Sequence, residues 1–280
     1  MADVHIRQRA TPFTYVLRGL VIVYLFMLVA WPVSLVATNT FANGFDALAG
    51  IFEDPDMRHA LGLTAFAALV ATAINTVFGV SVSLLLVRTE FPGKRLLSAL
   101  LDLPLAISPI VVGLALVLVY GGRGGWFGPT LESAGFRVIF STPGIIMATA
   151  FVALPLVIRE VVPVLKEIGT EQEQAAYSLG ANGWQTFWRI TLPSIRWAVV
   201  YGVVLTLARS LGEFGAVKVV SGNILGQTRT ATLAVEEKYL NFDTEGAYAI
   251  AFLLASVSVA CIIVVSVLRS RAARPRKADS

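Results

Sequence analysis

The chain is poor in the residues on which many catalytic sites depend. Its one cysteine, Cys261, excludes an internal disulfide and any zinc or iron site built on cysteine spacing. Its two histidines, His5 and His59, lie near the N-terminus and in a predicted external loop, which excludes an intramembrane Ser-His pair and a histidine-rich metal site. No Gly-x-x-x-x-Gly-Lys-Ser/Thr motif occurs, so there is no P-loop for a nucleotide. We predict no catalytic residue, metal site or cofactor in this chain.

Charged residues are scarce as well, at 14%, against roughly a quarter in soluble domains. A bilayer crossing needs about 20 apolar residues in a helix, because lipid offers the backbone no partners. Six such runs occur, near residues 20–37, 60–87, 96–120, 139–158, 197–217 and 247–268. The first run follows three arginines as a signal sequence would, but it is long and no cleavage pattern follows it. We predict an all-α integral membrane protein with six transmembrane helices.

Lysine and arginine indicate which side each loop faces, because short cytoplasmic loops are enriched in both. Fifteen of the 22 lie in the two termini and in the loops after the second and fourth runs, and six lie in the other loops. We therefore predict a multi-pass protein of the bacterial plasma membrane with a cytoplasmic N-terminus (1–19), a transmembrane domain (20–268) and a basic cytoplasmic tail (269–280). The net charge of +4 is then a topology signal and no sign of nucleic-acid binding.

Proline and glycine mark two irregular segments. Pro104 and Pro109 are expected to kink or break the third run, because proline donates no backbone hydrogen bond. The glycine-rich stretch 121–125 that follows is interpreted as an external loop, although its amides could also form an anion nest.

The loop at residues 165–194, between the fourth and fifth runs, is predicted to form two short cytoplasmic helices. Thr170 and Glu173 have the spacing of a capping box, and Gly180 supplies the left-handed residue that ends the first helix. Asn182 and Gln185 repeat the capping pattern for the second helix.

An aromatic stripe follows on the second helix. Trp184, Phe187 and Trp188 share one helical face at i, i+3 and i+4. From the residues alone, this stripe can settle in the membrane interface or in a groove on another protein.

The spacing of loop 165–194 resembles the signature of permease subunits of ATP-binding-cassette (ABC) importers. There, Glu-Ala-Ala, three residues, Gly, nine residues, Ile, one residue and Leu-Pro recur, and this chain departs only where Gln174 replaces the glutamate. The resemblance implies that the loop couples the permease to a separate ATPase, which carries ATP and magnesium. The implied coupling residues are Gln174, Ala175, Ala176, Gly180, Trp184, Phe187, Ile190, Leu192 and Pro193.

The fifth run contains two ionisable residues, Arg209 and Glu213, four positions apart. A central arginine costs about 2.5–3.5 kcal/mol to insert, so neither residue should face lipid. One interpretation is a buried pair that fixes helix packing. The other is a translocation path for a dianion, lined by Arg209, Ser210, Gly212, Glu213 and Gly215, where the glycines let backbones approach.

The stretch from Arg209 to Ala216 also resembles permeases for tetrahedral oxyanions, and the CysW-type sulfate and thiosulfate permeases most of all. This resemblance implies a homologous CysT-type permease, two copies of a CysA-type ATPase and an extracytoplasmic sulfate-binding protein as partners. Import of molybdate, tungstate or another oxyanion is the alternative within the family. A self-sufficient channel or secondary transporter is the alternative outside it, but it leaves loop 165–194 without a role.

Overall fold

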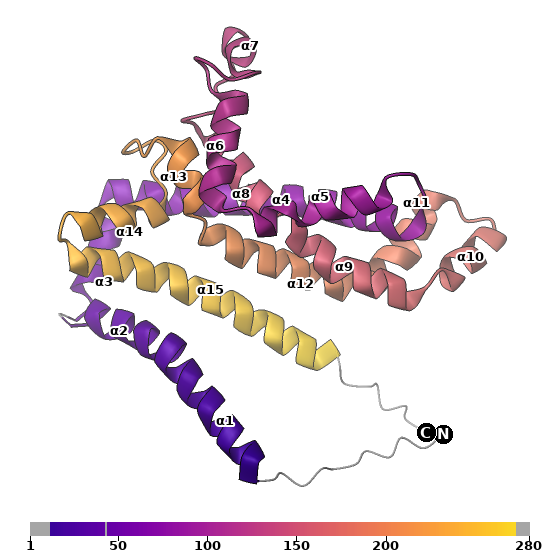
Figure 1. Cartoon of the computed structure of the whole chain (residues 1–280), viewed down its shortest axis with the longest axis horizontal. Coiled ribbons are helices and arrows are strands. Elements are labelled where there is room, and N and C mark those ends of the chain that lie inside the picture. Colours follow the sequence, from indigo (N-terminus) through magenta and orange to yellow (C-terminus); the bar gives the residue numbers. More distant parts are fainter. Residues whose placement is uncertain (1–11, 43, 273–280) are drawn as a thin grey trace.

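The computed structural model describes residues 12–42 and 44–272, and all regular structure in those ranges is helical (Figure 1). The first elements are α1 (Pro12–Leu25), η1 (Phe26–Ala30), α2 (Trp31–Thr40), α3 (Asp46–Glu53), α4 (Pro55–Arg88), α5 (Lys94–Ala106), α6 (Pro109–Tyr120) and α7 (Gly128–Ser133). They are followed by α8 (Thr142–Ala153), α9 (Pro155–Ile168), α10 (Glu171–Ser178), α11 (Gly183–Thr186) and η2 (Phe187–Thr191). The last are α12 (Leu192–Leu211), α13 (Gly215–Ser221), α14 (Ala231–Leu240) and α15 (Thr244–Ala272).

Within the described residues, five helices are long and apolar enough to cross a membrane, and the bent pair α5–α6 makes a sixth. Each of these segments overlaps one of the six predicted runs, so the predicted all-α membrane fold is confirmed. The first helix extends back at least to Pro12, before the predicted start at residue 20. α4 has 34 residues and is about 51 Å long, so it must tilt or extend beyond the hydrocarbon.

The predicted break in the third run is confirmed, and it lies at Pro109. α5 and α6 meet at 113°. Ser108 is extended, as expected for the residue before a proline, and Ile107 is extended as well. Pro104 lies inside α5 without ending it. As a result, α6 turns sharply away from the direction of α5 in Figure 1, and α7 lies at its far end.

The predicted fifth helix differs from the observed one at both ends. It begins with α11 and passes through the π-helical turn η2 into α12, so the second short helix of loop 165–194 is part of this span. It then ends at Leu211, and α13 starts separately at Gly215. The prediction of one helix over residues 197–217 was therefore wrong at Gly212. A side chain at Gly215 would lie 3.0 Å from Cβ of Pro109, so the break seats α13 closely against α6.

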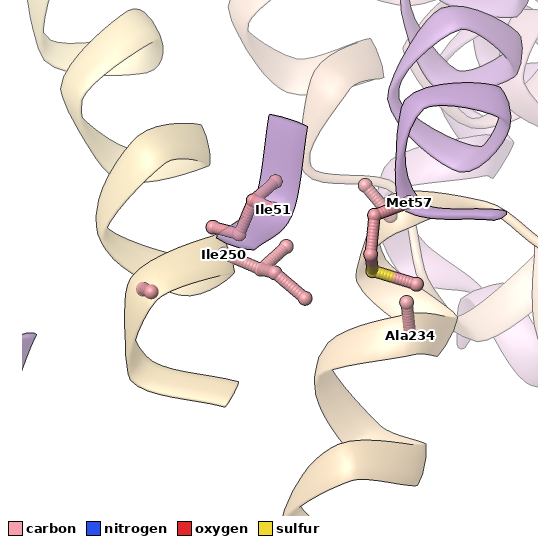
Figure 2. Packing of buried hydrophobic residues seen from close by; sticks show 6 residues of the cluster. Ile51, Met57, Ala234 and Ile250 are labelled. Carbon is pink, nitrogen blue, oxygen red and sulfur yellow. The ribbon is translucent and has the colours of Figure 1, made fainter. Parts of the chain in front are cut away.

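Clusters of buried apolar side chains hold the bundle together, and two of them each join at least three helices. In one, Val157 of α9 is fully buried between Gly79 of α4 and Gly202 of α12, both too close to it to accept a Cβ. In the other, Ile51, Met57, Ala234 and Ile250 join α3, α4, α14 and α15 (Figure 2). The first cluster fixes the positions of α4, α9 and α12 relative to one another.

Candidate functional site

The end of α10 has the geometry predicted at Gly180. This glycine has φ +86°, and the N–H groups of Gly180 and Ala181 donate to the carbonyls of Tyr177 and Ala176, each at 3.0 Å. These two bonds define a Schellman motif, which satisfies carbonyls left open at a helix end. The chain therefore turns sharply out of α10 at a position that favours glycine.

The start of α10 differs from the prediction. Thr170 makes no side-chain cap, and Glu173 does not reach back to it, so the predicted capping box was wrong. Glu173 instead pairs with Arg88 at the end of α4, with Oε2 lying 2.9 Å from Nε. A charge-assisted hydrogen bond is roughly twice as strong as one between neutral groups. This difference explains why the Glu173 carboxylate contacts Arg88 and not the backbone N–H of Thr170. Gln174 takes the contact with Thr170, its Nε2 lying 3.1 Å from Oγ1.

The second capping box is confirmed. Asn182 Oδ1 accepts from the N–H of Gln185 at 2.8 Å, and Gln185 Oε1 accepts from the N–H of Asn182 at 3.0 Å. The helix then continues into α12 because η2 shifts the bonding register, with the N–H of Leu192 donating to the carbonyl of Phe187. Pro193 lies in the first turn of α12, immediately after this register shift.

Trp184, Phe187 and Trp188 cluster as predicted, with ring centroids 5.4 to 6.3 Å apart. Phe187 packs against the core, whereas Trp184 is 70% exposed and Trp188 49% exposed. Tyr177 and Leu179 of the preceding turn are also exposed. We call Tyr177, Leu179, Trp184 and Trp188 the aromatic surface.

The remaining predicted coupling residues divide between surface and interior. Gln174, Ala175 and Pro193 are exposed, and Ala176 is buried. Leu192 packs with Phe187 against the cluster around Val157, and Ile190 is half-buried.

Arg209 and Glu213 form the ion pair that their spacing suggests, although the helix ends between them. Arg209 Nη1 lies 2.8 Å from Glu213 Oε2. The other carboxylate oxygen, Oε1, accepts from the N–H of Ala216 in α13 at 3.0 Å. The Thr232 hydroxyl of α14 donates to the Glu213 carbonyl at 2.9 Å. Glu213 therefore ties α12, α13 and α14 together at the break.

The other residues of the predicted path lie around this break in different settings. Ser210 is buried. Gly212 is exposed, and its nearest neighbour beyond the adjacent residues is a carbonyl 4.0 Å from an added Cβ, so no close approach requires glycine there. Gly215 does make the close approach that was expected, to Pro109.

Sequence reasoning missed the contacts that join distant segments. Arg88 was counted only as a topology charge, yet it contacts Glu173 85 positions away. Arg159 of α9, also counted as a loop charge, pairs with Asp102 of α5 at 3.1 Å. An arginine that directly ends a long apolar helix, as Arg88 does, is the one sequence signal that could have pointed to such a contact.

The sequence profile of the binding-protein-dependent transport system inner membrane component matches residues 75–274, which is more than half of the chain. The chain belongs to this family. The permease is 46% identical over 256 residues to a protein described as the sulfate transport system permease protein CysW of Synechococcus elongatus, covering 91% of this chain and 89% of that protein. It is 39% identical over 224 residues to the sulfate transport system permease protein CysT of Escherichia coli, covering 80% of each chain.

Among solved structures, the permease resembles a bacterial alginate ABC transporter in complex with a periplasmic protein that holds an alginate pentasaccharide. The TM-score is 0.74, with 95% of each chain covered and 17% sequence identity. At this identity the likeness concerns the fold alone.

Proposed function

We propose that this permease is the CysW-type subunit of an ABC importer that moves sulfate, and with it thiosulfate, into the cytoplasm. The observation that carries the proposal is the 46% identity to a CysW protein over 91% of the chain. The charge pattern supports an orientation in a bacterial plasma membrane with both termini and loop 165–194 in the cytoplasm.

Energy for transport would come from a separate ATPase, since the sequence has no P-loop for ATP and magnesium. The aromatic surface gives that partner a place to bind. Burying apolar surface contributes about 25 cal/mol per Å², and exposed tryptophans offer much of it. We propose that a CysA-type ATPase accepts α10 and the aromatic surface in a groove, one copy for this chain and one for a CysT-type permease.

The break after α12 is where we propose that the anion passes. Arg209 has a 40% exposed side chain near the end of a span whose other arginines, Arg189 and Arg196, lie in its first half, and an arginine facing lipid would be costly. We propose that this side chain faces a path shared with the CysT-type partner, where it attracts the dianion. Glu213 would hold Arg209 in place and keep the empty path from binding sulfate too tightly. An extracytoplasmic binding protein would deliver the anion and set most of the specificity.

The test of the substrate is uptake of radiolabelled sulfate in cells deleted for this chain and complemented with it. We expect deletion to abolish uptake, complementation to restore it, and excess unlabelled thiosulfate to compete better than molybdate. Unchanged sulfate uptake with lost molybdate or tungstate uptake would keep the permease and overturn its substrate. Uptake without any ATPase subunit would instead favour a secondary transporter.

The test of the docking site is Trp184→Ser, read as the amount of ATPase that co-purifies with the permease. Trp126→Ser is the matched control, because Trp126 is 81% exposed but lies outside loop 165–194. We expect Trp184→Ser alone to release the ATPase. Equal retention by both variants would overturn the docking site.

A further inference from the structure

Arg88, the last residue of α4, makes contacts with two other elements through one guanidinium group. Its Nε lies 2.9 Å from Glu173 Oε2, and its Nη2 donates to Glu173 Oε1 at 3.2 Å. Nη1 donates to the carbonyl of Leu165 at 3.1 Å, and Nη2 to that of Gly169 at 2.6 Å. The side chain thus connects the end of α4 with the end of α9 and with α10.

Glu173 extends this network to the fifth span. The hydroxyl of Thr191, in η2, donates to Glu173 Oε1 at 2.8 Å. Arg88, Glu173 and Thr191 therefore join four segments that are separate in the sequence: the ends of α4 and α9, α10, and the start of the fifth span. We call these three residues the Arg88–Glu173 clamp.

The clamp is built to be stiff. The side chains of Arg88 and Glu173 are only 15% and 14% exposed, so water competes weakly for their contacts. The guanidinium is planar and carries its donors in a fixed fork, which lysine cannot reproduce. Its carbonyl partners belong to the C-terminal end of α9, where open carbonyls carry partial negative charge. Gly169 has φ +65°, a conformation that favours glycine, where the chain turns from α9 into α10.

The position of the clamp gives it a mechanical role. Glu173 is half-buried, whereas Gln174, Ala175 and Tyr177 of the same short helix are exposed. A partner that pushes on the exposed side of α10 would act on a helix whose buried side is held by the contact between Glu173 and Arg88. α4 in turn contacts α9 and α12 through Gly79, Val157 and Gly202, and α12 ends beside Arg209. A displacement of α10 therefore has a continuous path of contacts to the break at Gly212.

We propose that the Arg88–Glu173 clamp transmits the movement of α10 to α4 and the fifth span, which makes Arg88 and Glu173 positioning residues for coupling ATP hydrolysis to transport. The proposal rests on the function proposed above for loop 165–194. Without the clamp, the turn at Gly169 absorbs the movement, and ATP is hydrolysed with little transport.

The test uses the complete importer, with the partner permease, ATPase and binding protein, reconstituted in vesicles. Radiolabelled sulfate uptake and phosphate release are measured in the same vesicles for Glu173→Gln and Arg88→Lys. Thr191→Val removes only the hydroxyl contact. Glu90→Gln is the matched control, since Glu90 is 89% exposed and lies two residues after Arg88, outside loop 165–194. The amount and melting temperature of the assembled complex are measured alongside.

We expect sulfate taken up per ATP hydrolysed to fall at least about tenfold in Glu173→Gln and Arg88→Lys, since contacts to buried charged groups are being lost. Thr191→Val should show a smaller fall and Glu90→Gln none. An unchanged ratio in Glu173→Gln would overturn the proposal. So would failure of Glu173→Gln to assemble, because the pair would then serve folding.

Different results would overturn the proposed function and the proposed role of the clamp. A wild-type importer that takes up molybdate in place of sulfate would overturn only the substrate, and the uptake ratio would then be measured with molybdate. A wild-type chain that transports without an ATPase would overturn both.

Discussion

The carboxylate of Glu213 lies 2.8 Å from the guanidinium of Arg209, yet the two side chains differ in exposure, at 2% for the glutamate and 40% for the arginine. Oε1 of Glu213 also accepts from the N–H of Ala216, so each carboxylate oxygen has a contact within the protein. The pair can therefore be a packing device, as the burial of Glu213 suggests, or a means of placing the exposed Arg209 in a path for anions. Substituting the two residues together separates these roles.

We predict that the double variant Arg209→Gln/Glu213→Gln assembles normally and loses at least about tenfold of sulfate uptake. Removing only one partner leaves the other charge uncompensated, which is costly where that charge is buried, whereas replacing both partners leaves no uncompensated charge. The amide oxygen that Glu213→Gln introduces can still accept from the Ala216 N–H. Uptake and the melting temperature of the purified complex are the measurements.

The single variant Arg209→Gln serves as the control for this prediction. It should melt lower than the double variant, because it leaves the Glu213 carboxylate buried without its cation. A double variant that is stable and transports sulfate at the wild-type rate would reduce the pair to a packing role.

Gly180→Ala should weaken retention of the ATPase, while Gly183→Ala should not. Gly180 has φ +86°, a region that costs an alanine about 1–2 kcal/mol, and it forms the turn between α10 and α11. Gly183 lies three residues away as the first residue of α11, and an added Cβ there would meet only the Tyr177 hydroxyl at 3.9 Å. The measurement is the amount of ATPase that co-purifies with each variant, and equal retention by both would contradict the prediction.

The features that sequence reasoning predicted correctly depend on neighbouring residues. Gly180, the Asn182 capping box and the break at Pro109 each follow from the conformational preferences of a few adjacent positions. The six spans follow in the same way from uninterrupted apolar length.

The features that sequence reasoning missed depend on distant residues. The capping box at Thr170 failed because Arg88 offers Glu173 a stronger partner. The end of α12 was misplaced because α13 packs against Pro109, which lies far earlier in the chain. The position of Arg88 at the end of a long apolar helix points to a contact without identifying its partner, and no local pattern marks the contact of Gly215 with Pro109.

The stability of the loop before α15 should depend on pH because of Asp243. Its Oδ2 accepts from Lys238 Nζ at 2.7 Å, and its Oδ1 accepts from the N–H of Gly246 at 3.0 Å, at the start of α15. The hydrogen bond from Lys238 lowers the pKa of Asp243 below its ordinary value of 3.8, with help from the Gly246 N–H. A lowered pKa in the folded state means that the charged carboxylate stabilises the fold above the ordinary pKa.

That stabilisation is lost as the pH falls through the lowered pKa of Asp243. We therefore predict that Asp243→Asn reduces the drop in melting temperature of the purified permease between about pH 6 and pH 3. Asparagine keeps an oxygen for the Gly246 N–H but does not titrate. A variant whose melting temperature drops as far as that of the wild type would show that Asp243 contributes nothing to this dependence.

The contact of Gly202 with Val157 should be needed for stable packing of the bundle. A Cβ at Gly202 would lie 2.9 Å from the Val157 Cα, a backbone atom that cannot rotate away. Overpacking of this kind costs about 1–3 kcal/mol, so Gly202→Ala should lower the melting temperature in detergent. Gly62→Ala is the matched control on α4, since nothing lies within 4 Å of its added Cβ and alanine is the better helix former. If the two variants have the same melting temperature, α12 can move away from α9 without a loss of stability. The close packing of α4, α9 and α12 is then not what holds the fifth span in place.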